Sequence, residues 1–291
     1  MVTVTPVSHS AAPRDSEQVA ASRRPIDRRS VQALLTGDGG GGTGRWRVEQ
    51  ADVTGSTNAD VAAAAPGAAS GLVLTAEEQL TGRGRAGRDW SCPAGAGLMF
   101  SVLLRVPEIP AERRGWTGSV LGLAIVAAMA RVGGVTATLK WPNDVLIGGA
   151  KCAGILGEVA DDALVVGAGI NVSLTADELP RADATSLLLA GGGSGRLDRE
   201  ALLAAILDEL AELLDRWAAA AGDIDASGLR DRYRRACSTI GSRVRLTLPD
   251  GATLVGEAVD VVADGSLLVQ DGTGRHRAYT AADVVHLRPE R

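Results

Sequence analysis

Short apolar runs and longer stretches with helical spacing alternate along the chain from Trp46 to Ala236. Short apolar or alternating runs bounded by turn residues predict β-strands at 46–53, 72–76, 98–105, 136–141, 145–147, 152–159 and 164–174. Apolar residues at intervals of three or four, or an alanine-rich stretch behind a capping residue, predict helices at 56–67, 120–130, 198–217 and 227–236. Strands and helices mixed in this order predict an α+β domain over residues 45–236.

The pattern changes after residue 236, where alternating apolar positions become short and regular. They predict five strands at 244–248, 254–262, 267–270, 275–279 and 284–287. Asp-Gly turns separate several of these runs, and turn signals at this spacing are typical of a small β-barrel or sandwich. We therefore expect a second, β domain over residues 237–291.

Residues 1–44 contain Pro, Ser, Gly and charges of both signs, and they have no apolar segment of the signal-peptide kind. This composition predicts a disordered tail. The longest apolar run, 120–130, is too short to cross a bilayer. We expect it to form a buried helix, and we expect no membrane partner.

The charge and the scarcity of two residue types exclude several classes of protein. The formal net charge is −5, which disfavours a surface that binds nucleic acid throughout. The histidines, His9, His276 and His286, lie in the tail and near the C-terminus, so neither a zinc site made of histidines nor a Ser-His-Asp triad is expected. The three cysteines form no C-x-x-C pair, which argues against a disulfide scaffold or zinc ribbon and indicates a reducing, cytoplasmic setting.

Lysine is rare in this chain. Of the 30 basic residues, only Lys140 and Lys151 are lysines, and the other 28 are arginines. Codon bias explains the excess of arginine. The two remaining lysines either escaped that bias by chance or stand where a compact, titratable ammonium is needed, because the two cations are not interchangeable.

The segment from Gly82 to Trp90 is dense in glycine and arginine. It matches G-x-G-x-x-G, but the Ser-Cys-Pro-Ala-Gly that follows cannot begin the helix that a dinucleotide-binding site requires. A P-loop is also excluded, because no Lys-Ser or Lys-Thr closes the motif. Glycines allow the backbone to approach a ligand closely, and arginine side chains can donate two hydrogen bonds at once to a phosphate or a carboxylate. The loop therefore fits a phosphate ligand, with a solvated surface turn or an RGG-like segment as the alternative.

Three further segments carry polar residues at strand ends: Lys140–Asp144, Lys151–Glu158 and Gly167–Val172. A carboxylate such as Asp144 beside phosphates is typical of a magnesium ion, which takes few protein carboxylates plus phosphate oxygens. Asn171 follows a strand and could read an adenine or carboxamide edge. Each segment alone also fits a purely structural explanation, as a turn or a strand end.

Taken together, the four segments resemble the catalytic domain of biotin protein ligases. The resemblance rests on the strings GRGRAGRDW, KWPND, KCAGIL and GAGIN, which keep the family's order and spacing over residues 48–171. It implies a mixed β-sheet catalytic domain packed with helices, the class II synthetase-like biotin–lipoate ligase fold, followed by a small C-terminal SH3-like β-barrel. The implied reaction joins biotin and ATP to biotinyl-5′-AMP and then transfers the biotinyl group to a lysine of a carrier domain.

The resemblance also implies roles for individual residues. Lys151, Arg83 and Arg85 would be catalytic, neutralising the biotin carboxylate and the α-phosphate. The residues expected to contact biotin are Ser56, Thr57, Asn58, Gln79, Arg83, Gly84, Arg85, Lys151 and Gly154. The residues expected to contact ATP or the adenylate are Arg83, Arg85, Arg88, Trp90, Lys140, Asn143, Asp144, Lys151 and Asn171. Asp144 would also bind Mg²⁺.

The resemblance leaves two other functions open, a lipoate-type protein ligase and a non-catalytic binding module with a degenerate site. Intact Lys151, Arg83 and Asp144 argue against the second. We expect the partner to be the biotin carboxyl carrier domain of an acetyl-CoA or acyl-CoA carboxylase. Because residues 1–44 lack the pattern of a winged-helix module, we expect no DNA binding. We further expect a monomer or a weak homodimer, and a Gly82–Arg88 loop that is mobile without ligand.

Overall fold

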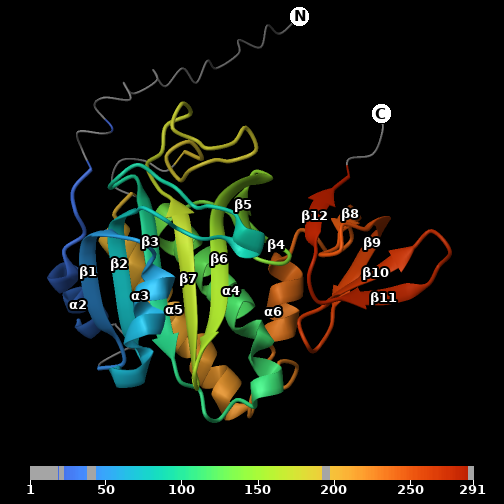
Figure 1. The fold of residues 1–291 in the computed structure, drawn as a ribbon, viewed down its shortest axis with the longest axis horizontal. Coiled ribbons are helices and arrows are strands. Elements are labelled where there is room, and N and C mark those ends of the chain that lie inside the picture. The colour runs from blue at the N-terminus through green and yellow to red at the C-terminus, as the bar shows by residue number, and fades with distance from the viewer. Residues whose placement is uncertain (1–18, 20–22, 38–43, 192–196, 288–291) are drawn as a thin grey trace, which may run out of the picture.

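Two β-sheets organise the chain in the computed structural model, which describes residues 19, 23–37, 44–191 and 197–287 (Figure 1). The larger sheet has seven strands in the order β1-β2-β3-β7-β6-β5-β4. Its strands are β1 (Arg47–Thr54), β2 (Leu72–Gln79), β3 (Gly97–Leu104), β4 (Ala137–Lys140), β5 (Asp144–Ile147), β6 (Ala150–Ala160) and β7 (Ala163–Asn171). β1 and β2 are parallel and all other neighbours are antiparallel, so the mixed sheet expected from the sequence is confirmed.

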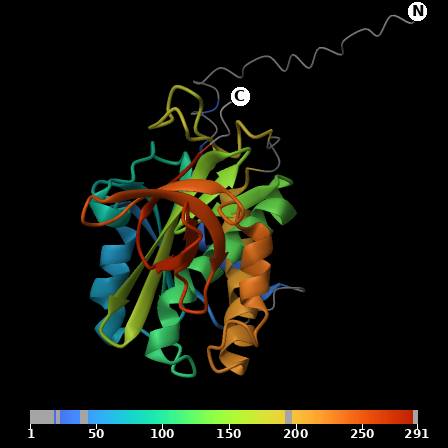
Figure 2. The same cartoon turned by 90° about the vertical axis from the view of Figure 1, so that its right-hand side faces the viewer.

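Helices cover both faces of this sheet. α3 (Thr57–Ala64) lies on one face, and α4 (Thr117–Ala128) and α5 (Arg199–Ala219) lie on the other (Figure 2). Strand β3, beside the central strand β7, is buried along its whole length. Its Leu103 packs beneath α3 with Val61, whereas Phe100 belongs to the larger core on the opposite face, because successive side chains of a strand point to opposite faces.

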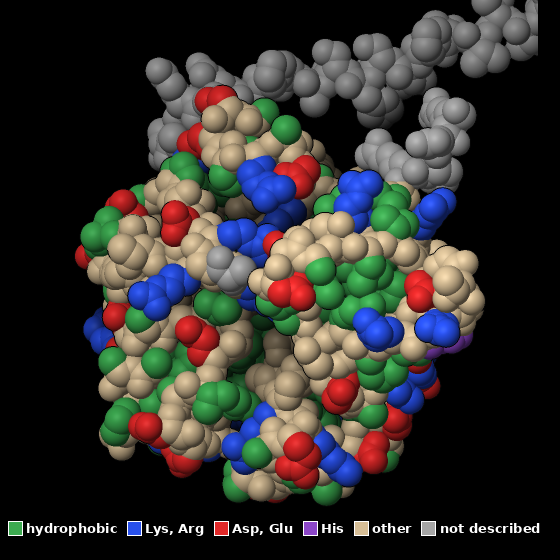
Figure 3. All heavy atoms as spheres, turned by 45° about the vertical axis from the view of Figure 1, so that its right-hand side comes forward, with side chains coloured by type: hydrophobic (Ala, Val, Ile, Leu, Met, Phe, Trp, Pro, Cys, Tyr) green, Lys and Arg blue, Asp and Glu red, His purple; other side chains and the backbone are tan. Residues whose placement is uncertain are grey.

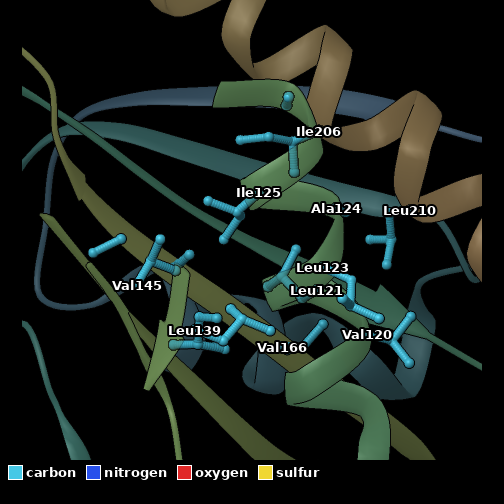
Figure 4. Close-up of a cluster of buried hydrophobic side chains, with 14 of the residues drawn as sticks. Val120, Leu121, Leu123, Ala124, Ile125, Leu139, Val145, Val166, Ile206 and Leu210 are labelled. Atoms are coloured by element: carbon cyan, nitrogen blue, oxygen red, sulfur yellow. The ribbon is translucent and has the colours of Figure 1, made fainter. Parts of the chain in front are cut away.

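The helix α4 is apolar on all sides because it lies between the sheet and α5. Leu121 and Ile125 are fully buried, and Figure 4 shows α4 side chains between Val166 of the sheet and Leu210 of α5. Within the described residues, one helical stretch, Ala111–Gly133, is long and apolar enough by composition to cross a membrane. It comprises a 3₁₀ turn (Ala111–Trp116), α4 and a π turn (Met129–Gly133), and its burial is that of a core helix.

The N-terminal segment contains an element that the sequence analysis missed. α2 (Arg28–Thr36) begins at Asp27, whose side chain accepts a hydrogen bond from the backbone N–H of Arg29. Val31 and Leu35, one helical turn apart, are fully buried. The prediction of a disordered tail is therefore wrong for residues 23–37. The rest of that predicted tail lies outside the described residues, apart from Val19 and Gly44.

The predicted helix after Asp198 is confirmed as α5. The Asp198 side chain accepts hydrogen bonds from the backbone N–H groups of Glu200 and Ala201, the arrangement that an N-cap aspartate provides. α6 (Leu229–Ala236) follows and leads into the smaller sheet.

The smaller sheet is antiparallel, with strand order β11-β10-β9-β8-β12 (Figure 1). Its strands are β8 (Arg243–Thr247), β9 (Thr253–Val261), β10 (Leu267–Asp271), β11 (His276–Tyr279) and β12 (Asp283–His286). Five strands were predicted here. Within these strands, β11 and β12 form the two edges and do not pair, so the sheet is consistent with an SH3-like domain but is not closed into a barrel.

Tryptophans of the larger domain join the two sheets. The indole N–H of Trp116 donates to the carbonyl of Ala263 at 2.7 Å, and that of Trp141 donates to the carbonyl of Gly265 at 3.0 Å. Both rings are nearly fully buried. The β domain is thus packed against the end of the sheet at which β4 and β5 lie.

Candidate active site

A cavity of about 780 Å³ opens between the Gly/Arg loop, β4 to β7 and the edge strand β12. Lys and Arg side chains gather beside this hollow (Figure 3). Every site residue predicted from the sequence lines it: Ser56, Thr57, Asn58, Gln79, Arg83, Gly84, Arg85, Arg88, Trp90, Lys140, Asn143, Asp144, Lys151, Gly154 and Asn171. Segments far apart in the sequence therefore meet around one concave surface.

Lys151 and Asp144 form an ion pair inside the cavity. The Lys151 Nζ lies 2.6 Å from Asp144 Oδ1, and both side chains are mostly buried. A bulge between β5 and β6 makes this pair possible. Asp144 is paired with Gly154, but Leu146 is paired with Lys151 and not with Cys152. Because a one-residue shift turns side chains to the other face, the bulge puts Lys151 on the same face as Asp144.

The backbone of Lys151 is also held from its other side. Its N–H donates to the carbonyl of Asp183, and its carbonyl accepts from the N–H of Thr185, both at 2.8 Å. The ammonium is therefore carried by a strand residue that has partners on two sides. A cation fixed in this way does not have to reorganise when an anion arrives.

The Gly/Arg loop folds back on itself. The N–H of Gly84 donates to the carbonyl of Arg88 at 2.6 Å, and the N–H of Trp90 donates to the carbonyl of Gly82 at 2.8 Å. A Cβ atom on Gly82 would lie 2.3 Å from the Trp90 carbonyl oxygen, so this turn needs a glycine. Between these bonds, Arg85 points toward the cavity, and burial lowers its pKa while the charge of Asp283 opposes that shift.

The end of the loop contacts the β domain and the face of strands β6 and β7. Arg88 Nη2 lies 2.9 Å from Asp283 Oδ1 of β12, in an exposed ion pair. Trp90 lies on Gly154 and Gly169, which are paired across β6 and β7. A Cβ atom on Gly169 would lie 2.3 Å from the indole Nε1. The sequence analysis did not identify Gly169, although alternate glycines in a strand are a signal of close approach by another group.

The indole of Trp90 faces the ion pair. Lys151 Nζ lies 5.7 Å from the centre of the Trp90 ring, within the range of a cation–π contact. The indole N–H is buried and, among the described residues, has no hydrogen-bond partner. Burial of an unpaired donor is unfavourable, so this N–H is available to an acceptor on a ligand.

A polar cluster lies at the other end of the cavity. Gln79 Oε1 accepts from the backbone N–H of Thr57 at 2.8 Å and from its hydroxyl at 3.1 Å. The Ser101 hydroxyl lies 2.6 Å from Asn58 Oδ1, and Asn58 Nδ2 donates to Glu158 Oε2 at 2.7 Å. A pocket with fixed donors and acceptors suits a neutral, strongly polar ligand group.

Two members of this cluster, Ser101 and Glu158, were missed by the sequence analysis. A serine inside the otherwise apolar strand β3 was the available signal, because a buried hydroxyl needs a partner. The prediction that Ser56 and its neighbours cap α3 is only half right. Ser56 is the N-cap residue, but its side chain makes no capping hydrogen bond.

Three further predicted residues have structural partners. Asn143 Nδ2 donates to the carbonyl of Ile155, and Asn171 Nδ2 donates to the carbonyl of Thr185, each at 2.9 Å. Lys140 lies close enough to Asp183 and His286 to influence both. Its charge adds to the effect of Arg181 in lowering the pKa of Asp183, and it reinforces the lowering of the His286 pKa that burial causes.

The cavity therefore combines two sets of groups. One end presents Lys151 and the arginines of the loop, which can hold two anions close together. The other end presents a neutral polar cluster. Over the part of the chain that the structure describes, no group of three His, Cys, Asp or Glu side chains could hold a metal ion alone. A metal here would need ligands from a bound phosphate.

Comparisons with known proteins agree with this geometry. The family model described as biotin/lipoate A/B protein ligase matches residues 51–174. The model described as biotin protein ligase C terminal domain matches residues 239–287. Together they cover the sheet that forms the cavity and the smaller sheet beside it.

Individual relatives cover between 70% and 91% of this chain. A biotin–(acetyl-CoA-carboxylase) ligase of Mycobacterium tuberculosis is 43% identical over 274 residues, which are 91% of this chain and 97% of the relative. The bifunctional ligase/repressor of Escherichia coli K12 is 32% identical over 70% of this chain and 63% of its own length. A biotin protein ligase of Aquifex aeolicus, solved with biotin and ATP, superposes with a TM-score of 0.70 at 26% identity and covers 83% of this chain and 99% of that one. This chain belongs to the biotin protein ligase family.

Proposed function

We propose that this protein activates biotin with ATP, forming biotinyl-5′-AMP and pyrophosphate, and then transfers the biotinyl group to a lysine of a carrier domain. The acceptor is the biotin carboxyl carrier domain of an acetyl-CoA or acyl-CoA carboxylase. The observation that carries the proposal is the Lys151–Asp144 pair, 2.6 Å apart, in a cavity that it shares with the arginine loop. The relative named as a biotin–(acetyl-CoA-carboxylase) ligase, matched over 97% of its length, supports the substrate.

In the first step, a carboxylate oxygen of biotin attacks the α-phosphorus of ATP and pyrophosphate leaves. Two anions must approach each other, so cations at the point of contact lower the barrier. Lys151, which lines the cavity together with the arginines of the loop, bridges the biotin carboxylate and the α-phosphate. Arg83 and Arg85 neutralise the charge that grows on the phosphate oxygens. Asp144, which holds Lys151 before the ligands bind, is then displaced from the ammonium.

The two substrates occupy opposite ends of the cavity. Biotin's ureido ring is bound by Ser56, Thr57, Asn58 and Gln79. Of these, Thr57 is held by Gln79, and Ser101 binds both Thr57 and Asn58. Gly84 and Gly154 allow the chain to approach biotin closely. The nucleotide lies among Arg88, Trp90, Lys140, Asn143, Asp144 and Asn171, all of which line the cavity. The side-chain amides of Asn143 and Asn171 are engaged with backbone carbonyls, so they contribute through their oxygens and by shaping the wall.

Magnesium enters as part of the nucleotide substrate. Asp144 supplies one carboxylate, and Mg²⁺ characteristically combines one or two carboxylates with phosphate oxygens and water.

In the second step, a neutral lysine amine of the carrier attacks the biotinyl carbonyl and AMP leaves. Water must be kept from the mixed anhydride, which it would hydrolyse. The Gly/Arg loop and Trp90 cover this part of the cavity. We place the reaction in the cytoplasm, where the three free thiols, Cys92, Cys152 and Cys237, stay reduced. We further propose a monomer or weak homodimer that does not bind DNA.

The experiment that tests the proposal is the exchange of labelled pyrophosphate into ATP. Exchange should require biotin, should not proceed with lipoate, and should be lost in Lys151→Ala. Arg216→Ala, an exposed position on α5 outside the cavity, is the matched control and should exchange normally. Exchange with lipoate alone would identify a lipoate-type ligase. No exchange with either acid would leave a non-catalytic binding module.

A further inference from the structure

The residues before α2 form a strap across the end of the larger sheet. We use this name for Arg23–Asp27. The N–H of Ile26 donates to Glu77 Oε1 at 2.7 Å. Glu77 pairs with Arg199 at 2.8 Å, and both side chains are over nine-tenths buried. The N–H of Asp27 donates to Glu200 Oε1 at 2.7 Å. The strap is thus held between the end of β2 and the start of α5.

Arg23 reaches from the strap to a loop on the cavity rim. Its guanidinium donates two hydrogen bonds to the two carboxylate oxygens of Glu178, at 2.9 and 2.6 Å. It also donates to the Ser173 hydroxyl at 3.1 Å and to the Ser173 carbonyl at 2.8 Å. The Arg23 side chain is only 8% exposed. Its stem packs on Gly95, where an added Cβ would lie 3.0 Å from the Arg23 Cβ. One buried side chain therefore contacts two loops beside the cavity.

The loop that contains Glu178 also contacts Lys151. It runs from residue 172 to 188, at the top of Figure 1. Hydrogen bonds close its base, from Leu187 N to the Asn171 carbonyl at 3.0 Å and from the Ser186 hydroxyl to the Leu174 carbonyl at 2.6 Å. Its far side supplies the Asp183 carbonyl and Thr185 N–H that bind the Lys151 backbone.

Glu178 links the two ends of this connection. Besides Arg23, it accepts from the backbone N–H of Thr175 at 3.0 Å and from the Thr175 hydroxyl at 3.1 Å, so the turn 175–178 is closed on the carboxylate. The hydrogen bonds from Arg23 are the main reason that the pKa of Glu178 lies at about 2. The carboxylate is therefore ionised throughout the neutral pH range, so that its ion pair with Arg23 is kept.

We propose that Arg23 is a positioning residue for adenylation: through Glu178 it fixes loop 172–188, which in turn holds Lys151 and forms the nucleotide side of the cavity. Pro180, Arg181 and Asp183 of this loop line the cavity. The inference rests on the proposed function for its reaction, but the strap and its contacts stand independently of it. Residues 23–27, which precede the predicted catalytic domain in sequence, would thus contribute to the geometry of the active site.

Adenylation requires accurate placement of Lys151. Small displacements of a catalytic group from its reactive geometry reduce rates strongly. Loops lose order readily unless buried or charged contacts hold them. A bidentate ion pair is among the strongest hydrogen-bonded contacts available to a side chain. Here it holds the loop whose backbone binds the backbone of Lys151.

The test compares Arg23→Ala, Arg23→Lys and Glu178→Gln with the unmodified protein. Hydrogen exchange of residues 174–186 should rise about tenfold in Arg23→Ala, as expected when charged hydrogen bonds are lost. The kcat of biotin-dependent pyrophosphate exchange should fall about tenfold or more, with a smaller change in the KM for biotin. Arg23→Lys, which keeps the charge without the fork, should lie between the two.

Arg28→Ala is the matched control. Arg28 lies five residues further on and makes an exposed ion pair with Glu49 at 2.8 Å, so its loss should change neither the hydrogen exchange of the loop nor kcat. With Glu178→Ala as a further single variant, the double variant Arg23→Ala/Glu178→Ala should lose less than the sum of the two single losses, because both remove the Arg23–Glu178 contact.

Unchanged kcat and loop protection in a folded Arg23→Ala protein would overturn the proposal, as would losses that simply add in the double variant. If Arg23→Ala fails to fold, Glu178→Gln decides, since it leaves the strap in place and removes only the charge at the loop. If the unmodified protein does not exchange pyrophosphate at all, the proposed function fails, and the hydrogen-exchange comparison still tests the strap.

Discussion

Lys151 stands in a chain that otherwise uses arginine for nearly all of its positive charge. Its Nζ lies 2.6 Å from Asp144 and 5.7 Å from the Trp90 ring centre, and an added Cβ on Gly154 would lie 3.4 Å from the same nitrogen. These neighbours surround a compact ammonium at one point, a position that a planar guanidinium on a longer side chain does not reproduce. The placement of Lys140 and Lys151 in one cavity favours function over chance for both.

Lys151→Arg tests this interpretation. The charge is kept, but the wider guanidinium cannot occupy the same point between Asp144 and Trp90. Biotin-dependent pyrophosphate exchange should fall about 100-fold, the scale on which a fixed electrostatic contact to the reacting group acts. Activity close to that of the unmodified protein would mean that positive charge alone suffices.

Gly169 is the floor on which Trp90 lies. Gly169→Ala places a methyl group 2.3 Å from the indole nitrogen, so the ring must move and the end of the loop with it. We expect a change in tryptophan fluorescence that is absent when Trp90→Phe is also present, and weaker pyrophosphate exchange. Gly157→Ala, on β6 with no atom within 4 Å of the added carbon, is the control. Identical spectra and rates for both alanine variants would contradict this account.

Motif residues could be predicted from the sequence because each motif follows or begins a strand, and the strands bring them to one cavity. Residues outside the motifs could not be placed at the cavity, even where, as with Ser101, a polar residue in an apolar strand indicated a buried partner. Ser101 and Glu158 face the cavity cluster only because of strand register and the position of α3. Likewise, the bulge beside Leu146 that turns Lys151 toward Asp144 depends on pairing between strands, which local patterns do not fix.

At the scale of elements, the hydrophobic pattern located the strands of both sheets and helices α3 to α6 because these elements bury a regular set of apolar side chains. α2 was missed for the opposite reason. Its apolar residues Val31, Leu34 and Leu35 have helical spacing, but they span little more than one turn, in a segment whose composition predicted a tail. It is stabilised by packing against α5 and β1, contacts that arise only in the folded chain.

The Gly82–Arg88 loop should be more mobile without ligand than with it. It is held by three backbone hydrogen bonds within the turn and by the exposed Arg88–Asp283 pair, and exposed pairs contribute little to stability. Trypsin should therefore cut after Arg83, Arg85 or Arg88 more slowly in the presence of biotin and ATP than in their absence. Lipoate with ATP serves as the control and should give no protection. Equal cleavage in all conditions would count against a loop that orders over the substrates.

At the scale of the whole molecule, the β domain completes the cavity. Thr247, Asp283, Val284 and Val285 line it, and the Trp116 and Trp141 hydrogen bonds attach the domain to the larger sheet. The sequence predicted the domain and its strands. Its position relative to the cavity depends on these contacts between domains, so no pattern within either domain could predict it.

We expect His286 to make the stability of the folded protein sensitive to pH. Its ring nitrogen lies 3.0 Å from the Thr239 hydroxyl, and burial, reinforced by Lys140, lowers its pKa below the ordinary value of 6.5. The unfolded chain therefore binds this proton at a higher pH than the folded one. The stabilisation is complete above the ordinary pKa and decreases as the pH falls below it.

Thermal unfolding between about pH 7.5 and about pH 5.5, the range in which histidine titrates, tests this effect. The melting temperature of the unmodified protein should fall over this range more than that of His286→Gln, which keeps a polar side chain and cannot titrate. Parallel curves for the two proteins would show that His286 does not contribute to the pH dependence of stability.

The most direct test of the central claim is the transfer reaction itself. The protein is incubated with biotin, ATP and a purified biotin carboxyl carrier domain, and the carrier is examined by intact-mass and peptide mass spectrometry. We predict one biotinyl group on a single carrier lysine, dependent on ATP and absent with Lys151→Ala. A carrier that stays unmodified under these conditions, or one that accepts lipoate in place of biotin, would contradict the account.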